Sequence, residues 1–120
     1  MAEQKLVFDA NGQNFAQEVV AASKTRPVVV DFWAPWCGPC RMLGPILERV
    51  IGSMNGRAVL AKVNVDENPQ LSSQWRVQSI PAVKIFVNGV VAGEFVGAAP
   101  EAEVRRAIEA ALPKPAPATG

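Results

Sequence analysis

The chain has 120 residues, with 12 Lys and Arg against 11 Asp and Glu, so its formal net charge at pH 7 is +1, and one compact globular domain is expected. It contains no histidine, which excludes a serine-type catalytic triad, a Cys–His protease pair and a His-ligated metal. The balanced, scattered charge excludes an electrostatic footprint for nucleic acid, and no apolar run approaches the roughly 20 residues of a membrane helix.

The first third of the chain predicts a strand, a helix and a second strand. Val7 and Phe8 form a short apolar stretch that we interpret as an edge strand. A helical pattern follows Asn14, and Gln17, three residues later, would complete a capping box with it. Residues 27–33 form a β-branched and aromatic run, interrupted only by one charge, which is typical of a strand buried on both faces.

A long amphipathic helix is predicted directly after two cysteines. From Leu43 onward, apolar residues recur at helical spacing over three turns. Pro45 lies inside this pattern and should kink the helix. Asn55-Gly56 marks its expected end.

The second half of the chain predicts one more buried strand, a short helix, a hairpin and a final helix. Asn88-Gly89 is a strong signal for a two-residue hairpin turn. Glu101 and Glu103 suit the positive end of the last helix dipole. The expected elements are a strand over 58–65, a helix from Asn68-Pro69 to about Trp75, strands over 82–87 and 90–96, and a helix after Pro100 with Val104, Ile108 and Leu112 inward.

The order of these elements is βαβαβαββα. The early strands alternate with helices, which favours parallel pairing through crossover connections, whereas the last two strands form an antiparallel hairpin. The sequence therefore predicts an α/β fold, with a central mixed five-stranded sheet and helices on both faces.

Cys37 and Cys40 are the residues best suited to chemistry. Their i, i+3 spacing on a helix brings both sulfurs to one face, so a disulfide can form and break with little backbone movement. At the helix start, the Cys37 sulfur meets free N–H groups and the positive dipole end, which stabilise a thiolate. We therefore expect Cys37 to be the nucleophile, and the more buried Cys40 to resolve the resulting mixed disulfide.

Two cysteines at this spacing have other possible uses. A structural disulfide would close a very small loop and add little stability, and two reduced core cysteines would not need the Gly38-Pro39 spacer. A zinc or iron–sulfur site would need ligands from a second chain, because the sequence has no further Cys and no His. Haem attachment would require His where Arg41 stands. We expect no metal.

Residues 30–41, VDFWAPWCGPCR, resemble the active-site segment of the thioredoxin family. The resemblance runs from about Leu6 to Leu112 and also includes Pro45, residues 61–66, Asn68-Pro69, Ile80-Pro81, residues 86–89 and Val96-Gly97. It implies the thioredoxin fold, which we assign to residues 1–112, and protein-disulfide reductase activity.

The resemblance also implies how the protein obtains electrons. The Gly38-Pro39 spacer is the reducing type in this family, so the dithiol should donate electrons to a target disulfide. No cofactor would be bound, because NADPH would supply electrons through a thioredoxin reductase. We expect this reductase and disulfide-containing proteins as partners, and a monomer.

Asp31 is a single charge in an apolar central strand. Burial should raise its pKa, and its carboxylate could take the proton from Cys40 as that thiol attacks. The alternative is a buried acid that is merely hydrogen-bonded. The resemblance favours the role of a base for Asp31, and implies that the positive charge of Lys62 partly offsets the negative charge of Asp31. From sequence alone, Lys62 could be an ordinary strand-end residue with a snorkelling stem.

A substrate groove is likewise implied by the resemblance. In thioredoxins the bond equivalent to Ile80–Pro81 is cis and faces the disulfide, whereas the sequence itself shows only a proline before a strand. We expect Trp36 to be exposed, since it directly precedes the nucleophile. The groove residues would be Trp36, Val65, Ile80, Pro81, Gly97 and Ala98.

Three positions depart from the familiar family pattern. Ser79, Ala82 and Trp75 stand where Gly, Thr and Tyr are common. None belongs to the dithiol, and we expect any effect to fall on substrate preference.

The two ends of the chain carry further expectations. Lys5 precedes an apolar stretch too short for a signal-peptide core, so we expect a cytoplasmic protein. If a presequence has been removed from the chain, location in an organelle is the alternative. Residues 113–120 are rich in Pro and Ala and are expected to form a flexible tail or linker. Residues 98–103 and the ending Ala111-Leu112-Pro113 slightly resemble co-chaperones with tetratricopeptide repeats. A redox and client-binding module of such a larger protein is therefore the alternative function.

Overall fold

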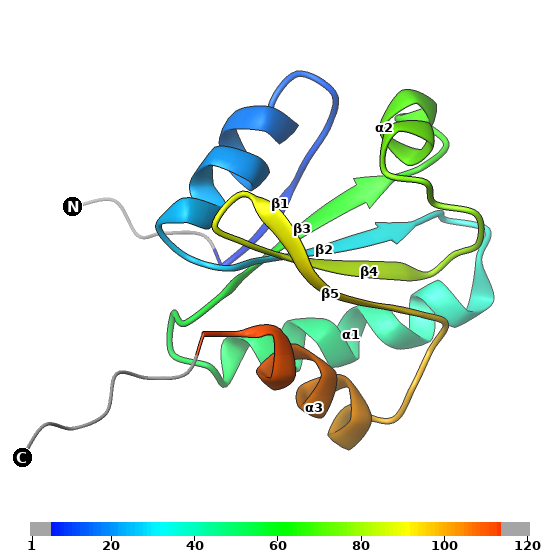
Figure 1. Cartoon of the computed structure of the whole chain (residues 1–120). Helices are drawn as coiled ribbons and strands as arrows, with labels where there is room; N and C mark the ends of the chain where they lie inside the picture. The colour runs from blue at the N-terminus through cyan, green and yellow to red at the C-terminus, as the bar shows by residue number, and fades with distance from the viewer. Residues whose placement is uncertain (1–5, 114–120) are drawn as a thin grey trace, which may run out of the picture.

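A five-stranded mixed sheet forms the centre of the computed structural model, which describes residues 6–113 (Figure 1). The strand order is β1-β3-β2-β4-β5, with β1 and β2 parallel to β3, and β4 antiparallel to both β2 and β5. The predicted α/β class and mixed sheet are confirmed. The strands are β1 (Val7–Asp9), β2 (Val28–Trp33), β3 (Val59–Asn64), β4 (Ala82–Val87) and β5 (Val90–Val96).

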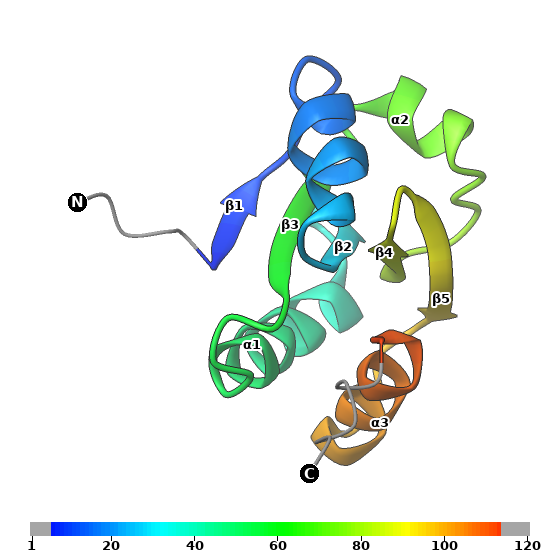
Figure 2. The same cartoon turned by 60° about the vertical axis from the view of Figure 1, so that its left-hand side comes forward.

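Helices cover both faces of this sheet. Figure 2 shows α1 and α3 on one side, with the N-terminal helical segment and α2 on the other. The helical elements are η1 (Ala16–Ala21), η2 (Ala22–Lys24), α1 (Gly38–Gly52), α2 (Pro69–Gln74) and α3 (Glu101–Ala111).

Alternation along β2 assigns each side chain to one of these faces. Val28, Val30 and Phe32 are fully buried in the core under η1 and α2. Val29 points the other way, into the core that α1 and α3 form. Because neighbouring strand residues alternate, Asp31 shares the face of Val29 and lies beneath α1.

The first helical segment does not start as predicted. The Asn14 side chain accepts a hydrogen bond from the Asn11 N–H at 2.8 Å, and no bond joins it to Gln17. Asn11 Oδ1 instead accepts from the backbone of Gln13 and Asn14, at 2.8 and 3.0 Å. The predicted capping box is therefore wrong, because these polar side chains bond within a local turn. A π-helix follows, and its N-cap, Phe15, makes no side-chain hydrogen bond.

The cysteine-bearing helix, α1, ends earlier than predicted. It is continuous through Pro45 but stops at Gly52, before the expected Asn55-Gly56. Asn55 and Gly56 have φ values of 54° and 82°, so they form a left-handed turn after the helix.

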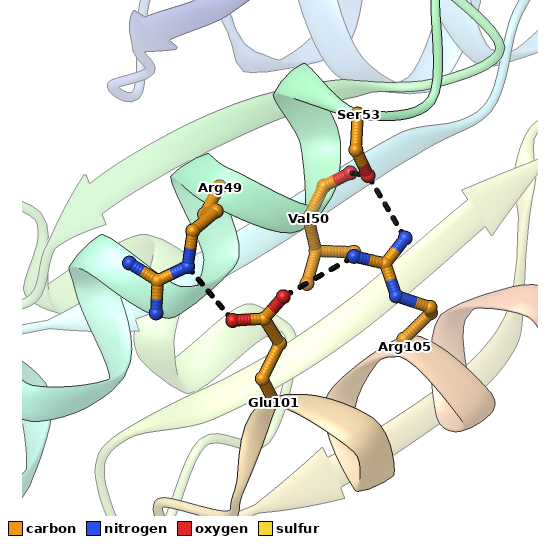
Figure 3. A network of polar contacts seen from close by, with 5 residues as sticks. All are labelled: Arg49, Val50, Ser53, Glu101 and Arg105. Atoms are coloured by element: carbon orange, nitrogen blue, oxygen red, sulfur yellow. Dashed lines mark hydrogen bonds and ion pairs between the residues drawn. The ribbon is translucent and has the colours of Figure 1, made fainter.

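A surface ion pair and a hydrogen bond join α1 and its C-cap to α3. Arg49 Nε of α1 donates to Glu101 Oε1 at 2.7 Å, and Arg105 Nη2 donates to Glu101 Oε2 at 3.3 Å (Figure 3). The Arg105 guanidinium also donates to Ser53 Oγ at 2.8 Å. These contacts connect the helix that carries the cysteines to the last helix of the fold.

The hairpin between β4 and β5 is confirmed with the predicted strand limits. Asn88 and Gly89 form its turn with φ values of 54° and 84°. Ser23, which is buried, accepts a bond from the Gly89 N–H at 2.8 Å and thereby joins the hairpin to η2. Of the predicted tail, residues 114–120 lie outside the described part of the chain.

Candidate active site

Cys37 caps the N-terminus of α1. Its backbone is extended, with φ −89° and ψ 111°, and its Sγ accepts a hydrogen bond from the Cys40 N–H at 3.2 Å. The two residues form a disulfide, with their Cα atoms 5.3 Å apart. Since that N–H is one of the groups the helix leaves unpaired, it would also stabilise a Cys37 thiolate.

The expected difference in burial between the two cysteines is wrong. Cys37 and Cys40 are each only 4% exposed. The disulfide holds the two side chains together, and both pack with Ala34 against the half-buried Val65 and Ile80. In the oxidised form the N-cap cysteine is therefore covered as completely as the one within the first turn.

Trp36 lies on the surface beside this disulfide, as predicted. Its side chain is 67% exposed, and its indole N–H donates to Asp66 Oδ2 at 2.9 Å. Asp66 follows β3 in the chain, so this bond connects the loop before Cys37 to the end of the neighbouring strand.

The loop before β4 meets the end of β5 at the remaining groove positions. The Ile80–Pro81 peptide bond is cis, as the resemblance implied. The Gly97 N–H donates to the Pro81 carbonyl at 2.8 Å, and Gly97 has a φ of 92°, a value that favours glycine. Ala98 is exposed next to it.

Asp31 is completely buried beneath α1. Within residues 6–113, neither of its carboxylate oxygens has a hydrogen-bond partner on the protein. Desolvation raises the pKa of Asp31 from 3.8 to about 6. The positive charge of Lys62 opposes this rise in pKa, as the resemblance implied, and the negative charge of Glu48 adds to it.

Lys62 lies within β3, in register with Asp31, and is not a strand-end residue. Its Nζ is 3.3 Å from Glu48 Oε2 of α1 and 5.3 Å from the centre of the Trp33 ring. The ammonium therefore sits between the sheet and α1, with Glu48 as its bonded partner.

The three departures from the family pattern occupy different environments. Trp75 packs into the core, with ring centres 5.6 Å from Phe15 and 5.0 Å from Phe86. Ala82 is buried at the start of β4, whereas Ser79 is exposed in the preceding loop. Of the three, Ser79 is therefore the one placed on the surface.

The sequence interpretation missed Asp66 and Glu48. Nothing in the local sequence marks Asp66, because its contact spans 30 positions of the chain. Glu48 had a weak signal, since it follows Cys40 by about two helical turns and so shares its side of α1.

No cluster of three or more potential metal ligands occurs among the described residues. In the same part of the chain, none of the helices has the length and apolar character needed to cross a membrane.

A disulfide between i, i+3 cysteines, at the N-terminus of a helix that leaves a central sheet strand, defines the class: a thiol–disulfide oxidoreductase. Residues 6–110 match the family model of thioredoxin. The chain belongs to the thioredoxin family, and its activity is that of a protein-disulfide reductase.

Curated relatives agree with this assignment over nearly their whole length. The chain is 43% identical to thioredoxin 2 of Chlorobaculum tepidum over 102 residues, which cover 85% of the chain and 92% of that protein. It is 44% identical to thioredoxin 1 of a Nostoc species over 95 residues, covering 79% and 87%. It is 41% identical to thioredoxin of Rhodospirillum rubrum over 108 residues, covering 90% and 99%. Nothing in these comparisons supports the co-chaperone alternative.

Proposed function

We propose that Cys37 is the nucleophile and Cys40 the resolving thiol of this reductase. The Cys37 thiolate attacks one sulfur of a substrate disulfide, and the other substrate sulfur leaves as a thiolate that takes up a proton. Cys40 then attacks Cys37 Sγ, and the second substrate thiolate leaves. Two electrons pass to the substrate, and the Cys37–Cys40 disulfide remains.

The observation that carries this assignment is the hydrogen bond from the Cys40 N–H to Cys37 Sγ. A thiolate at Cys37 keeps that donor and lies at the positive end of α1, whereas Cys40 lies within the helix. The N-cap position therefore favours ionisation of Cys37.

Trapping of the mixed disulfide tests these roles. Reduced Cys40→Ser, incubated with a disulfide-containing protein, should accumulate a covalent adduct through Cys37, because the resolving thiol is missing. Cys37→Ser is the matched control and should accumulate little. Faster trapping through Cys40 in Cys37→Ser would reverse the assignment.

We further propose that Asp31 is the base for the second step. Its carboxylate accepts the Cys40 proton as Cys40 attacks, and a pKa of about 6 suits a base that works near neutral pH. The positive charge of Lys62 partly offsets the negative charge of Asp31. Asp31→Asn should slow resolution of the mixed disulfide at neutral pH; an unchanged rate from pH 6 to 9 would remove Asp31 from the mechanism.

The substrate segment is proposed to bind across the surface around the disulfide. Trp36 offers an exposed ring, and the backbone next to the cis Ile80–Pro81 bond would pair with an extended substrate segment. The rest of the surface consists of Val65, Ile80 and Ala98. Apolar and backbone contacts of this kind suit many different protein disulfides.

We propose NADPH, acting through a thioredoxin reductase, as the electron source, and a cytoplasmic monomer as the working form. Residues 1–112 would be the catalytic domain and residues 113–120 a flexible tail. Insulin reduction with NADPH and a thioredoxin reductase tests the electron source, and light scattering tests the monomer. A Cys37–Cys40 reduction potential above that of cytosolic glutathione, about −220 to −260 mV, would contradict a reductant.

A further inference from the structure

Lys62 has acidic residues as register partners on both neighbouring strands, but its ammonium is bonded to a third acidic residue. Asp31 of β2 and Asp9 of β1 are its register partners on the two sides of β3. Neither makes an ion pair with Lys62, whereas Glu48 of α1 approaches its Nζ to 3.3 Å. The ammonium is therefore bonded to the helix and not to the buried carboxylate.

We propose that Glu48 is a positioning residue: it binds the Lys62 ammonium and so keeps Asp31 an effective proton acceptor for Cys40. This inference rests on the proposed role of Asp31. Glu48 itself touches neither the dithiol nor a substrate in this assignment; it acts through Lys62.

The surroundings of Lys62 support this positioning. A Cβ atom placed on Gly44 would lie 3.6 Å from Lys62 Nζ, so the ammonium lies against the backbone of α1 one turn before Glu48. The Trp33 ring lies 5.3 Å from the same atom. The side chain of Lys62 is 22% exposed and that of Glu48 is 48% exposed, so the ammonium is the shielded end of this ion pair.

Few other charges face Asp31. On β4 its register partner is Val83, and Lys84 points to the opposite face, where it binds Glu94 at 2.6 Å. On α3, Glu101 is bound to Arg49 and Arg105. Lys62 and Glu48 are accordingly the two charges that act on the pKa of Asp31, with opposite signs.

Removal of the Glu48 charge therefore has an unambiguous direction. The loss of a negative neighbour favours ionised Asp31, and a released Lys62 can approach Asp31 and favour it further. Both effects lower the Asp31 pKa. A carboxylate with a lower pKa is a weaker base, so it takes the Cys40 proton less readily.

The direct test is an NMR titration of the Asp31 carboxyl carbon in the full-length oxidised protein, in which no thiol titrates. Asp31→Asn identifies the signal by its loss. In Glu48→Gln the pKa should fall by roughly 0.5 to 1. Glu48→Asp, which keeps the charge, should retain most of the original value.

Two controls separate positioning from a general charge effect. Glu94→Gln removes an exposed glutamate that binds a lysine on the other face, and should leave the Asp31 pKa unchanged. In a Lys62→Met background, Glu48→Gln should shift the pKa less than in the wild type. An unchanged or raised pKa in Glu48→Gln would overturn the proposal, as would a shift of the same size with and without Lys62.

A kinetic measurement distinguishes this proposal from that for Asp31. With a Brønsted coefficient near 0.5, Glu48→Gln should slow resolution of a preformed mixed disulfide about 2- to 3-fold above pH 7. If Asp31→Asn does not slow this step, the base assignment fails. The NMR titration would still decide whether Glu48 controls Asp31.

Discussion

Asp31 and Lys62 are register partners on adjacent strands, yet no hydrogen bond joins their charged groups. The Lys62 ammonium binds Glu48, and within residues 6–113 both Asp31 oxygens lack a partner. The ionised carboxylate therefore lowers the free energy of unfolding, because burial of an unpaired charge opposes folding.

Asp31→Asn should consequently stabilise the oxidised protein in a pH-dependent way. Because the folded-state pKa is raised from 3.8 to about 6, the carboxyl costs little below pH 4, and its cost grows as the pH rises toward 6. A pKa difference of about 2 corresponds to about 3 kcal/mol. Urea unfolding should show a gain of up to about 3 kcal/mol at pH 8 and little of this gain at pH 4.

The comparison between the two pH values is the control for this prediction. An asparagine amide has its own cost of burial, but that cost does not change with pH. An equal gain in unfolding free energy at pH 4 and pH 8 would show that the effect does not come from the charge of Asp31.

Asp66→Ala should weaken substrate binding more than it weakens the fold. The variant loses the acceptor for the Trp36 indole N–H, so the exposed ring becomes free to rotate and must be ordered when a substrate binds. Ordering one side chain costs about 0.5 to 1.5 kcal/mol, which raises KM for a protein disulfide roughly 2- to 10-fold with kcat little changed.

Asp66→Asn is the matched variant, because its amide oxygen can still accept the Trp36 bond. It should keep KM near the wild-type value. If Asp66→Asn and Asp66→Ala raise KM equally, the charge at position 66 matters and the anchoring of Trp36 does not.

The regular secondary structure could be predicted from local sequence patterns. Hydrophobic periodicity located every strand to within a residue or two, and Asn88-Gly89 located the hairpin because its left-handed turn needs such residues. The start of the first helix was predicted wrongly, since the side chains of Asn11 and Asn14 bond within a local turn and neither caps the helix.

Some features of the active site could likewise be predicted from local sequence, and others could not. Cys37 at a helix start and an exposed Trp36 follow from position in the chain. The partners Asp66 and Glu48 depend on contacts between separate elements, which no local pattern encodes. The equal burial of the two cysteines depends on the disulfide itself and on Ile80 above it.

Gly93→Ala should destabilise the protein, because β5 and α3 approach each other closely at this position. A Cβ atom there would lie 2.9 Å from the Ala111 Cβ and 3.6 Å from Ile85 Cδ1. Overpacking of this kind costs about 1 to 3 kcal/mol. Denaturant unfolding measures the loss, and adding Ala111→Gly should recover part of it; if the double variant shows only the sum of the two losses, the contact with Ala111 is not the cause.

The same substitution at Gly44 should have the opposite sign. Gly44 lies within α1, and the nearest atom to a new Cβ would be Lys62 Nζ at 3.6 Å, an ordinary contact. Alanine restricts the unfolded chain and favours the helix, so Gly44→Ala should raise the free energy of unfolding by about 0.5 to 1 kcal/mol. A loss of stability would instead mean that the methyl group displaces Lys62, in which case the Asp31 pKa measured by NMR should change as well.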